Sequence, residues 1–183
     1  HHAPDAAEAV DADFDGHCFL LGLQKLASLN IMGDMKLSPS PRVVLDTNVL
    51  VAAARSAGGA SAMILRAFRA RRFQLLVSVP LMLEYEAVLK RPEHMAGRSM
   101  RDVEAVLALL NRWAKPVILH TLWRPQTRDP ADEMVLETAL NGRAHALVTF
   151  NQRDLAPPAR MFNLPVYTPG AFWQALETED PHG

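Results

Sequence analysis

From Arg42 onward, short apolar runs alternate with longer segments of helical character, and this alternation limits the fold more than any other feature of the chain. Runs of strand character cover residues 43–45, 73–77, 116–120, 146–149 and 166–168. Helices are predicted near residues 48–55, 61–71, 80–90, 99–114 and 129–142, and from residue 169 onward. Such alternation indicates an α/β fold with a mainly parallel central sheet.

Local signals fix several of the predicted helix ends. Pro80 suits the first turn of a helix. The run Ser99-Met100-Arg101-Asp102 resembles a capping box, and Gly142 is placed to close the helix that Asp129-Pro130 opens.

Asp46 follows the first apolar run directly, with Thr47 and Asn48 after it. Residues 43–45 read as a strand buried on both faces. Ligands of open α/β sheets bind outside the carboxyl ends of the strands, so Asp46 stands where a metal or phosphate is expected. Alternatively, Asp46 or Thr47 simply caps the next helix.

Size and composition set outer limits. The chain has 183 residues, which suits one domain, and a formal net charge of −1, so it carries no global basic signal for nucleic acid. Its one cysteine, Cys18, rules out an internal disulfide or a cysteine-rich metal site. The single cysteine fits a reducing cytoplasm, where we expect the protein to be. No apolar stretch approaches the ~20 residues of a membrane helix, so we expect no membrane partner.

Residues 1–40 differ from the rest of the chain. They begin with His1-His2 and continue with an acidic stretch, and Ser38-Pro39-Ser40-Pro41 suits a linker to the rest of the chain. We interpret them as a peripheral arm, either a tag remnant or an extension, and residues 41–179 as the functional domain.

Several acids accompany the predicted strand ends. Besides Asp46, they are Glu84 and Glu86 after the second strand, Asp129, Asp132 and Glu133 before the fourth, and Asp154 after it, beside Thr149 and Asn151. A parallel sheet brings these groups toward one edge. Ligands that carry only oxygen favour Mg²⁺ or Mn²⁺ over zinc.

Each acid also has a simpler interpretation. Asp129 and Asp132 have the form of an N-cap and a capping-box-like pair. Glu84 and Glu86 flank the apolar face of their helix, so periodicity does not choose between them. Asp154 fits a turn over residues 151–154.

Four arginines cluster near the end of one predicted helix: Arg66, Arg69, Arg71 and Arg72, with Arg55 upstream. They make either a solvated helix end, where cations are favoured, or a patch that contacts phosphates.

The chain from Arg42 to about Trp173 resembles PIN domains, in particular VapC-like toxins of bacterial toxin–antitoxin systems. Four motifs carry the resemblance: residues 45–50 (LDTNVL), 83–89 (LEYEAVL) with Arg91-Pro92, 128–133 (RDPADE) and 147–155 (LVTFNQRDL). The resemblance implies a PIN-like three-layer α/β/α sandwich and a ribonuclease that depends on Mg²⁺ or Mn²⁺.

The resemblance also implies roles for single residues. Asp46, Glu84 and Asp132 match the family's first three acids and would be both catalytic and metal-binding. Asn48 and Thr149 match its polar supporting residues, with Asp129 as an auxiliary acid or cap. The fourth acid falls on Asn151, whose amide oxygen brings no charge, and Asp154 would partly compensate. Arg66, Arg69 and Arg72 would bind RNA.

Three other functions are compatible with an acid at the end of the first strand, and the sequence argues against two of them. A phosphotransferase with Asp46 as nucleophile needs a second Asp two residues on, where the chain has Asn48. A phosphoacceptor needs a Lys after a late strand, and no Lys follows Val148. A catalytically weak PIN-like RNA-binding scaffold is the alternative, because of Asn151. The resemblance further implies RNA as substrate, a cognate antitoxin as partner and a homodimer.

Overall fold

The computed structural model describes residues 40–94, 99–122, 127 and 129–179. The arm predicted at residues 1–40 lies almost entirely outside the described residues.

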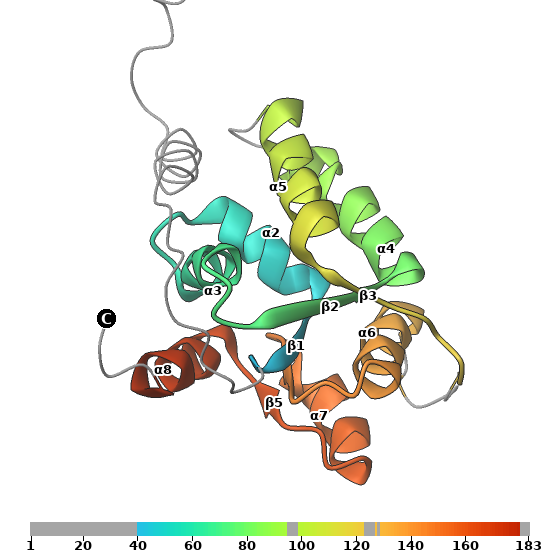
Figure 1. Ribbon diagram of the computed structural model, residues 1–183. Helices are drawn as coiled ribbons and strands as arrows, with labels where there is room; N and C mark the ends of the chain where they lie inside the picture. Colours follow the sequence, from blue (N-terminus) through green and yellow to red (C-terminus); the bar gives the residue numbers. More distant parts are fainter. Residues whose placement is uncertain (1–39, 95–98, 123–126, 128, 180–183) are drawn as a thin grey trace, which may run out of the picture.

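Five parallel strands form one sheet through the middle of the domain (Figure 1). They are β1 (Arg42–Leu45), β2 (Gln74–Ser78), β3 (Lys115–Val117), β4 (Ala146–Val148) and β5 (Val166–Tyr167). The order across the sheet is β3-β2-β1-β4-β5. In the central strand, Val43, Val44 and Leu45 are fully buried, which confirms a strand covered on both faces.

Helices cover both faces of the sheet, which gives the predicted three-layer α/β/α sandwich. Figure 1 shows α2, α3, α4 and α5 over one face, α6 and α7 over the other, and α8 beside α3. Their bounds are α2 (Thr47–Arg55), α3 (Ala60–Arg69), α4 (Val79–Leu89), α5 (Met100–Trp113), α6 (Pro130–Asn141), α7 (Gln152–Met161) and α8 (Pro169–Glu179), with a short 3₁₀ turn at Pro92–His94.

The structure confirms the capping residues that were predicted for α5 and α6. Ser99 and Asp102 form the capping box at the start of α5. Asp129 is the N-cap of α6, and its Oδ1 accepts a hydrogen bond from the Ala131 N–H at 2.9 Å. Pro130 takes the first turn of the same helix, where its missing N–H costs nothing.

Gly142 ends α6 for a different reason from the one predicted. Its φ is −78°, which any residue adopts, and the left-handed position next to it is taken by Arg143 (φ 49°). A Cβ on Gly142 would lie 2.7 Å from Leu76 Cδ1 and 2.9 Å from Val117 Cγ2. The glycine is therefore required by close packing of α6 on β2 and β3.

Helix α7 was not predicted, and the structure corrects the turn over residues 151–154. Asp154 lies in the first turn of α7, which continues through Pro157 and Pro158. Prolines inside a helix remove backbone donors, so the sequence argued against a helix here. Burial of Leu155, Pro158 and Ala159 favours the helix nonetheless. Strand β3 also ends earlier than predicted, at Val117.

No single helix in the described residues is long and apolar enough to cross a membrane. Helices α2 and α3 pass that test only as a pair, which is bent by 103°.

Candidate functional site

The site lies where the strand order reverses. Strands β1 and β4 are neighbours, yet the chain continues from β1 toward β2 and from β4 toward β5, so the connections diverge from this pair. Ligands of open α/β sheets bind at such a switch point, beyond the carboxyl ends of the strands. Asp46 follows β1 and Thr149 follows β4, and the Asp46 N–H donates to the Val148 carbonyl at 2.9 Å.

Asp46 is held by two side chains. Its Oδ2 accepts hydrogen bonds from Thr149 Oγ1 at 2.5 Å and from Asn48 Nδ2 at 2.6 Å. Asp46 is the N-cap residue of α2, but its side chain makes no capping hydrogen bond. Burial raises the pKa of this carboxyl above its ordinary value, and the hydrogen bonds offset only part of that rise. Thr149 and the Asn48 side chain therefore fix the orientation of this carboxylate.

A hydrogen-bonded path leads from Asp46 to Asp132. Thr149 Oγ1, which donates to Asp46, accepts from the Asn151 N–H at 2.8 Å, and Asn151 Nδ2 donates to Asp132 Oδ2 at 3.1 Å. The Asn151 amide therefore gives Asp132 a donor, which a fourth carboxylate would not provide. Burial, followed by the negative charges of Asp46, Asp129 and Asp154, raises the pKa of Asp132 to about 6.

A cavity of about 590 Å³, here called the acid hollow, opens beside Asp46. Of the two glutamates of α4, only Glu84 is among the residues that line it. Glu84 lines the hollow together with Asp46 and Asn48. Glu86 instead forms an ion pair with Lys90, one helical turn further along α4. The structure thus distinguishes two glutamates that periodicity left equal, and Glu84 is the one that lines the hollow with Asp46.

The remaining predicted acids lie at the margin of the site. Asp129 and Asp154 are close enough to act on the pKa of Asp132. Asp129 caps α6, while Glu133 Oε1 accepts a hydrogen bond from the Thr127 N–H at 2.7 Å.

Most of the other residues that line the site had no role predicted from the sequence; Arg55 had been named only as part of a candidate phosphate-contacting patch. Arg55 and His94 line the acid hollow and contact each other, with 2.9 Å between Arg55 Nη2 and His94 Nδ1. Phe150 also lines the hollow and is 56% exposed. Tyr85 is fully buried, and its hydroxyl donates to the carbonyl of Leu45, directly before Asp46. Only packing in three dimensions brings these residues together, so no local pattern signals them.

The acids fit a divalent cation by their chemistry. Asp46 and Asp132 are only 6% and 8% exposed, and within the described residues neither forms an ion pair with a Lys, Arg or His. Buried carboxylates without a counter-charge are costly, and a bound cation would compensate them. In the described part of the chain, no three His, Cys, Asp or Glu side chains are already grouped closely enough to hold a metal. Metal binding would therefore require the acids to move closer together than they lie in this structure.

The arginines predicted to bind RNA lie away from the acid hollow. Arg66 Nη1 donates to Met63 Sδ at 3.1 Å, and Arg72 Nη2 donates to the Leu176 carbonyl at 2.5 Å, which joins the end of α3 to α8. Partial burial lowers the pKa of Arg69. None of the three lines the acid hollow.

Comparison with known proteins defines the class. A family model described as PIN domain matches residues 42–153, which is more than half of the chain. This is a nuclease-type fold whose members are generally hydrolases and typically use divalent metal ions. The chain belongs to the PIN domain family. No curated protein matches the sequence.

Proposed function

We propose that this protein is an endoribonuclease that hydrolyses RNA phosphodiester bonds with Mg²⁺ or Mn²⁺. The observation that supports it best is the pair of buried carboxylates, Asp46 and Asp132, which the Thr149–Asn151 path joins at the switch point of the sheet. Both have raised pKa values, and Asp46 lines the acid hollow together with Glu84 and with Ala131, the residue before Asp132.

Asp46, Asp132 and Glu84 would hold the metal ion, with Asn151 and Asp154 completing its surroundings. The bound ion supplies charge for the attacked phosphate and lowers the pKa of a water molecule. Thr149 and Asn48 hold the Asp46 carboxylate in one orientation by donating to the same oxygen. Glu84, which lines the hollow, would accept a proton from the attacking water.

RNA is the substrate that the resemblance to VapC-like toxins implies. Two features of the acid hollow support a nucleic acid there. The exposed ring of Phe150 offers a surface on which a base can stack, and Arg55 places a cation beside the acids.

The direct test incubates the purified protein with single-stranded RNA, with Mn²⁺ or with EDTA. We expect cleavage only with Mn²⁺, products with 5′-phosphate and 3′-hydroxyl ends, and a loss of about 100-fold or more in rate for Asp46→Asn. Cleavage that persists in EDTA, or at the wild-type rate in Asp46→Asn, would overturn the assignment.

The toxin role and its partners are part of the same proposal. A cognate antitoxin would cover the acid hollow with a peptide segment, and two copies of the chain would form a homodimer. Co-expression with a gene encoded next to this one, followed by purification, tests the first. Light scattering of the purified protein tests the second.

A second candidate function is a catalytically weak RNA-binding scaffold. Asn151 favours it, because an amide replaces a charge at the position of the family's fourth acid, and Asp132 is held by that amide. A protein that binds RNA with the same affinity in Mn²⁺ and in EDTA, and cleaves it in neither, would be this scaffold.

A further inference from the structure

A second hollow, of about 290 Å³, lies at the opposite end of the strands from the acids. Gln74 begins β2 and lines this hollow, and Ser40, two residues before β1, lines it as well. The other walls are Phe68, Phe73, Arg71, Arg112 and Trp113. We call it the arginine hollow. Among the described residues, its walls combine two cations with aromatic rings and contain no acid.

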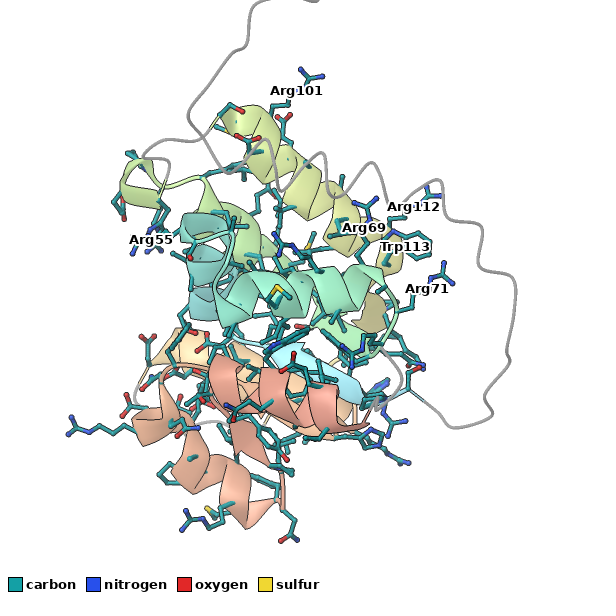
Figure 2. All side chains as sticks on the ribbon, turned by 90° about the vertical axis from the view of Figure 1, so that its left-hand side faces the viewer. Arg55, Arg69, Arg71, Arg101, Arg112 and Trp113 are labelled. Atoms are coloured by element: carbon teal, nitrogen blue, oxygen red, sulfur yellow. The ribbon has the colours of Figure 1, made fainter. Side chains whose placement is uncertain are left out.

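Trp113 holds both cations. The Arg71 guanidinium carbon lies 3.9 Å from the centroid of the Trp113 ring, and that of Arg112 lies 5.3 Å away. Figure 2 shows Trp113 between these two arginines at one end of the helical face, with Arg55 at the other end. Within the described residues, neither Arg71 nor Arg112 is ion-paired to an acid. A guanidinium stacked on a ring keeps its N–H groups available for a phosphate.

The backbone at Arg71 is unfavourable for an arginine. Helix α3 ends in a Schellman motif, in which the Arg71 N–H donates to Phe68 O at 2.9 Å and the Arg72 N–H donates to Ala67 O at 3.0 Å. Arg71 takes the left-handed position of that motif with φ 58°. Glycine is the usual residue there because it has no Cβ. Arg143 takes the same position at the end of α6, so this conformation provides a matched comparison for Arg71.

We propose that the arginine hollow is a second RNA contact, in which Arg71 and Arg112 bind backbone phosphates of a strand whose scissile bond lies in the acid hollow. The identity of the ligand rests on the proposed ribonuclease function. The acid hollow repels a polyanion, and the chain has a net charge of only −1, so affinity has to come from local cations. In Figure 2, Arg55 lies at one side of the helical layer, at the acid hollow, and Arg71 and Arg112 lie at the other side, at the arginine hollow.

The test compares two arginines in the same backbone setting. Arg143 also occupies the left-handed position of a Schellman motif, with φ 49°, and it lines neither hollow. Arg71→Gly and Arg143→Gly therefore make the same chemical change and relieve the same conformation. We expect both variants to melt within about 3 °C of the wild type.

Binding is measured by fluorescence anisotropy in EDTA, with a labelled single-stranded RNA of ~20 nucleotides, between about 50 and 200 mM salt. Arg71→Gly is expected to weaken binding about tenfold and to reduce the salt slope by about 0.7, while Arg143→Gly changes neither. Arg112→Gln is expected to weaken binding in the same way. Equal weakening by Arg71→Gly and Arg143→Gly would mean general charge loss and would overturn the proposal.

The same variants separate this proposal from the nuclease assignment. Binding that depends on Arg71, without any cleavage in Mn²⁺, supports the arginine hollow and contradicts the nuclease. Cleavage in Mn²⁺ with unchanged binding by Arg71→Gly contradicts only the arginine hollow. Poly-glutamate is a further probe: if it binds and RNA does not, the hollow takes an acidic polypeptide, and the RNA proposal is overturned.

Discussion

The acid hollow and the arginine hollow lie at opposite ends of the same strands. They differ in the burial of their charged side chains and in the contacts that hold those side chains in place. Asp46 is buried and receives two hydrogen bonds, and its pKa is raised. Arg71 is exposed and is held by stacking on Trp113.

This difference follows from what each region would bind. A small cation needs ligands fixed within a fraction of an ångström, so burial and hydrogen bonds suit the acids. A nucleic-acid backbone is bound best by cationic side chains at the surface. A planar guanidinium suits this role because removing water from it costs little free energy. The acid hollow is therefore expected to respond to pH and metal, and the arginine hollow to salt.

After the substitution of Asp46, the largest loss of cleavage rate is expected from the substitution of a glutamate on α4. Glu84→Gln should lower the Mn²⁺-dependent cleavage rate by about 10- to 100-fold, because Glu84 lines the same hollow as Asp46. Glu86→Gln is the matched control, since Glu86 pairs with Lys90 outside the hollow. A loss of activity in Glu86→Gln equal to that in Glu84→Gln would break the distinction between the two residues.

A smaller effect is expected at Asn151. Asn151→Asp adds the missing charge and should tighten Mn²⁺ binding at pH 7.5 by about tenfold, because ligand charge tunes affinity for hard cations. It also removes the donor to Asp132 Oδ2, so the metal-free protein should melt at a lower temperature. Asn163→Asp makes the same change at the far end of α7, in an exposed left-handed residue. Calorimetric titration with unchanged affinity in Asn151→Asp would exclude Asn151 from the metal site.

The smallest effect concerns pH and Asp132. Its pKa of about 6 in the folded protein exceeds the ordinary value of 3.8, so the folded chain holds this proton more tightly than the unfolded chain. Asp132 therefore lowers stability as the pH rises from about 4 to about 6. In EDTA at pH 7, Asp132→Asn should melt about 2–4 °C above the wild type, and near pH 4 the two should converge. A difference that is the same at both pH values would contradict the raised pKa.

Much of the fold could be predicted because its strands are buried on both faces and its caps are local. Val43–Leu45 and the Ser99–Asp102 capping box illustrate each case. Helix α7 could not, since Pro157 and Pro158 argue against a helix, and only its packing offsets that cost. The role of Gly142 was also hidden, because it depends on contacts with Leu76 and Val117 from two distant strands.

The sequence predicted which residues belong to the site better than it predicted the contacts between them. Asp46 and Thr149 follow adjacent strands, so topology places them together once the sheet is parallel. The hydrogen bond from the Asn151 amide to Asp132 joins the start of α7 to α6, and the spacing of residues in the sequence does not predict it. The stacking of Arg71 on Trp113 joins the ends of α3 and α5, which are more than forty positions apart in the sequence.

The central claim is that the acids at the switch point hold a divalent cation. Its most direct test is the melting temperature at pH 7.5 with and without Mn²⁺, for the wild type and for Asp46→Asn. A ligand at about 100 times its dissociation constant stabilises the folded state by about 2.7 kcal/mol, so we expect a rise of about 5–10 °C in the wild type. No rise is expected in Asp46→Asn. An equal rise in both proteins, or none in the wild type, would contradict the metal site.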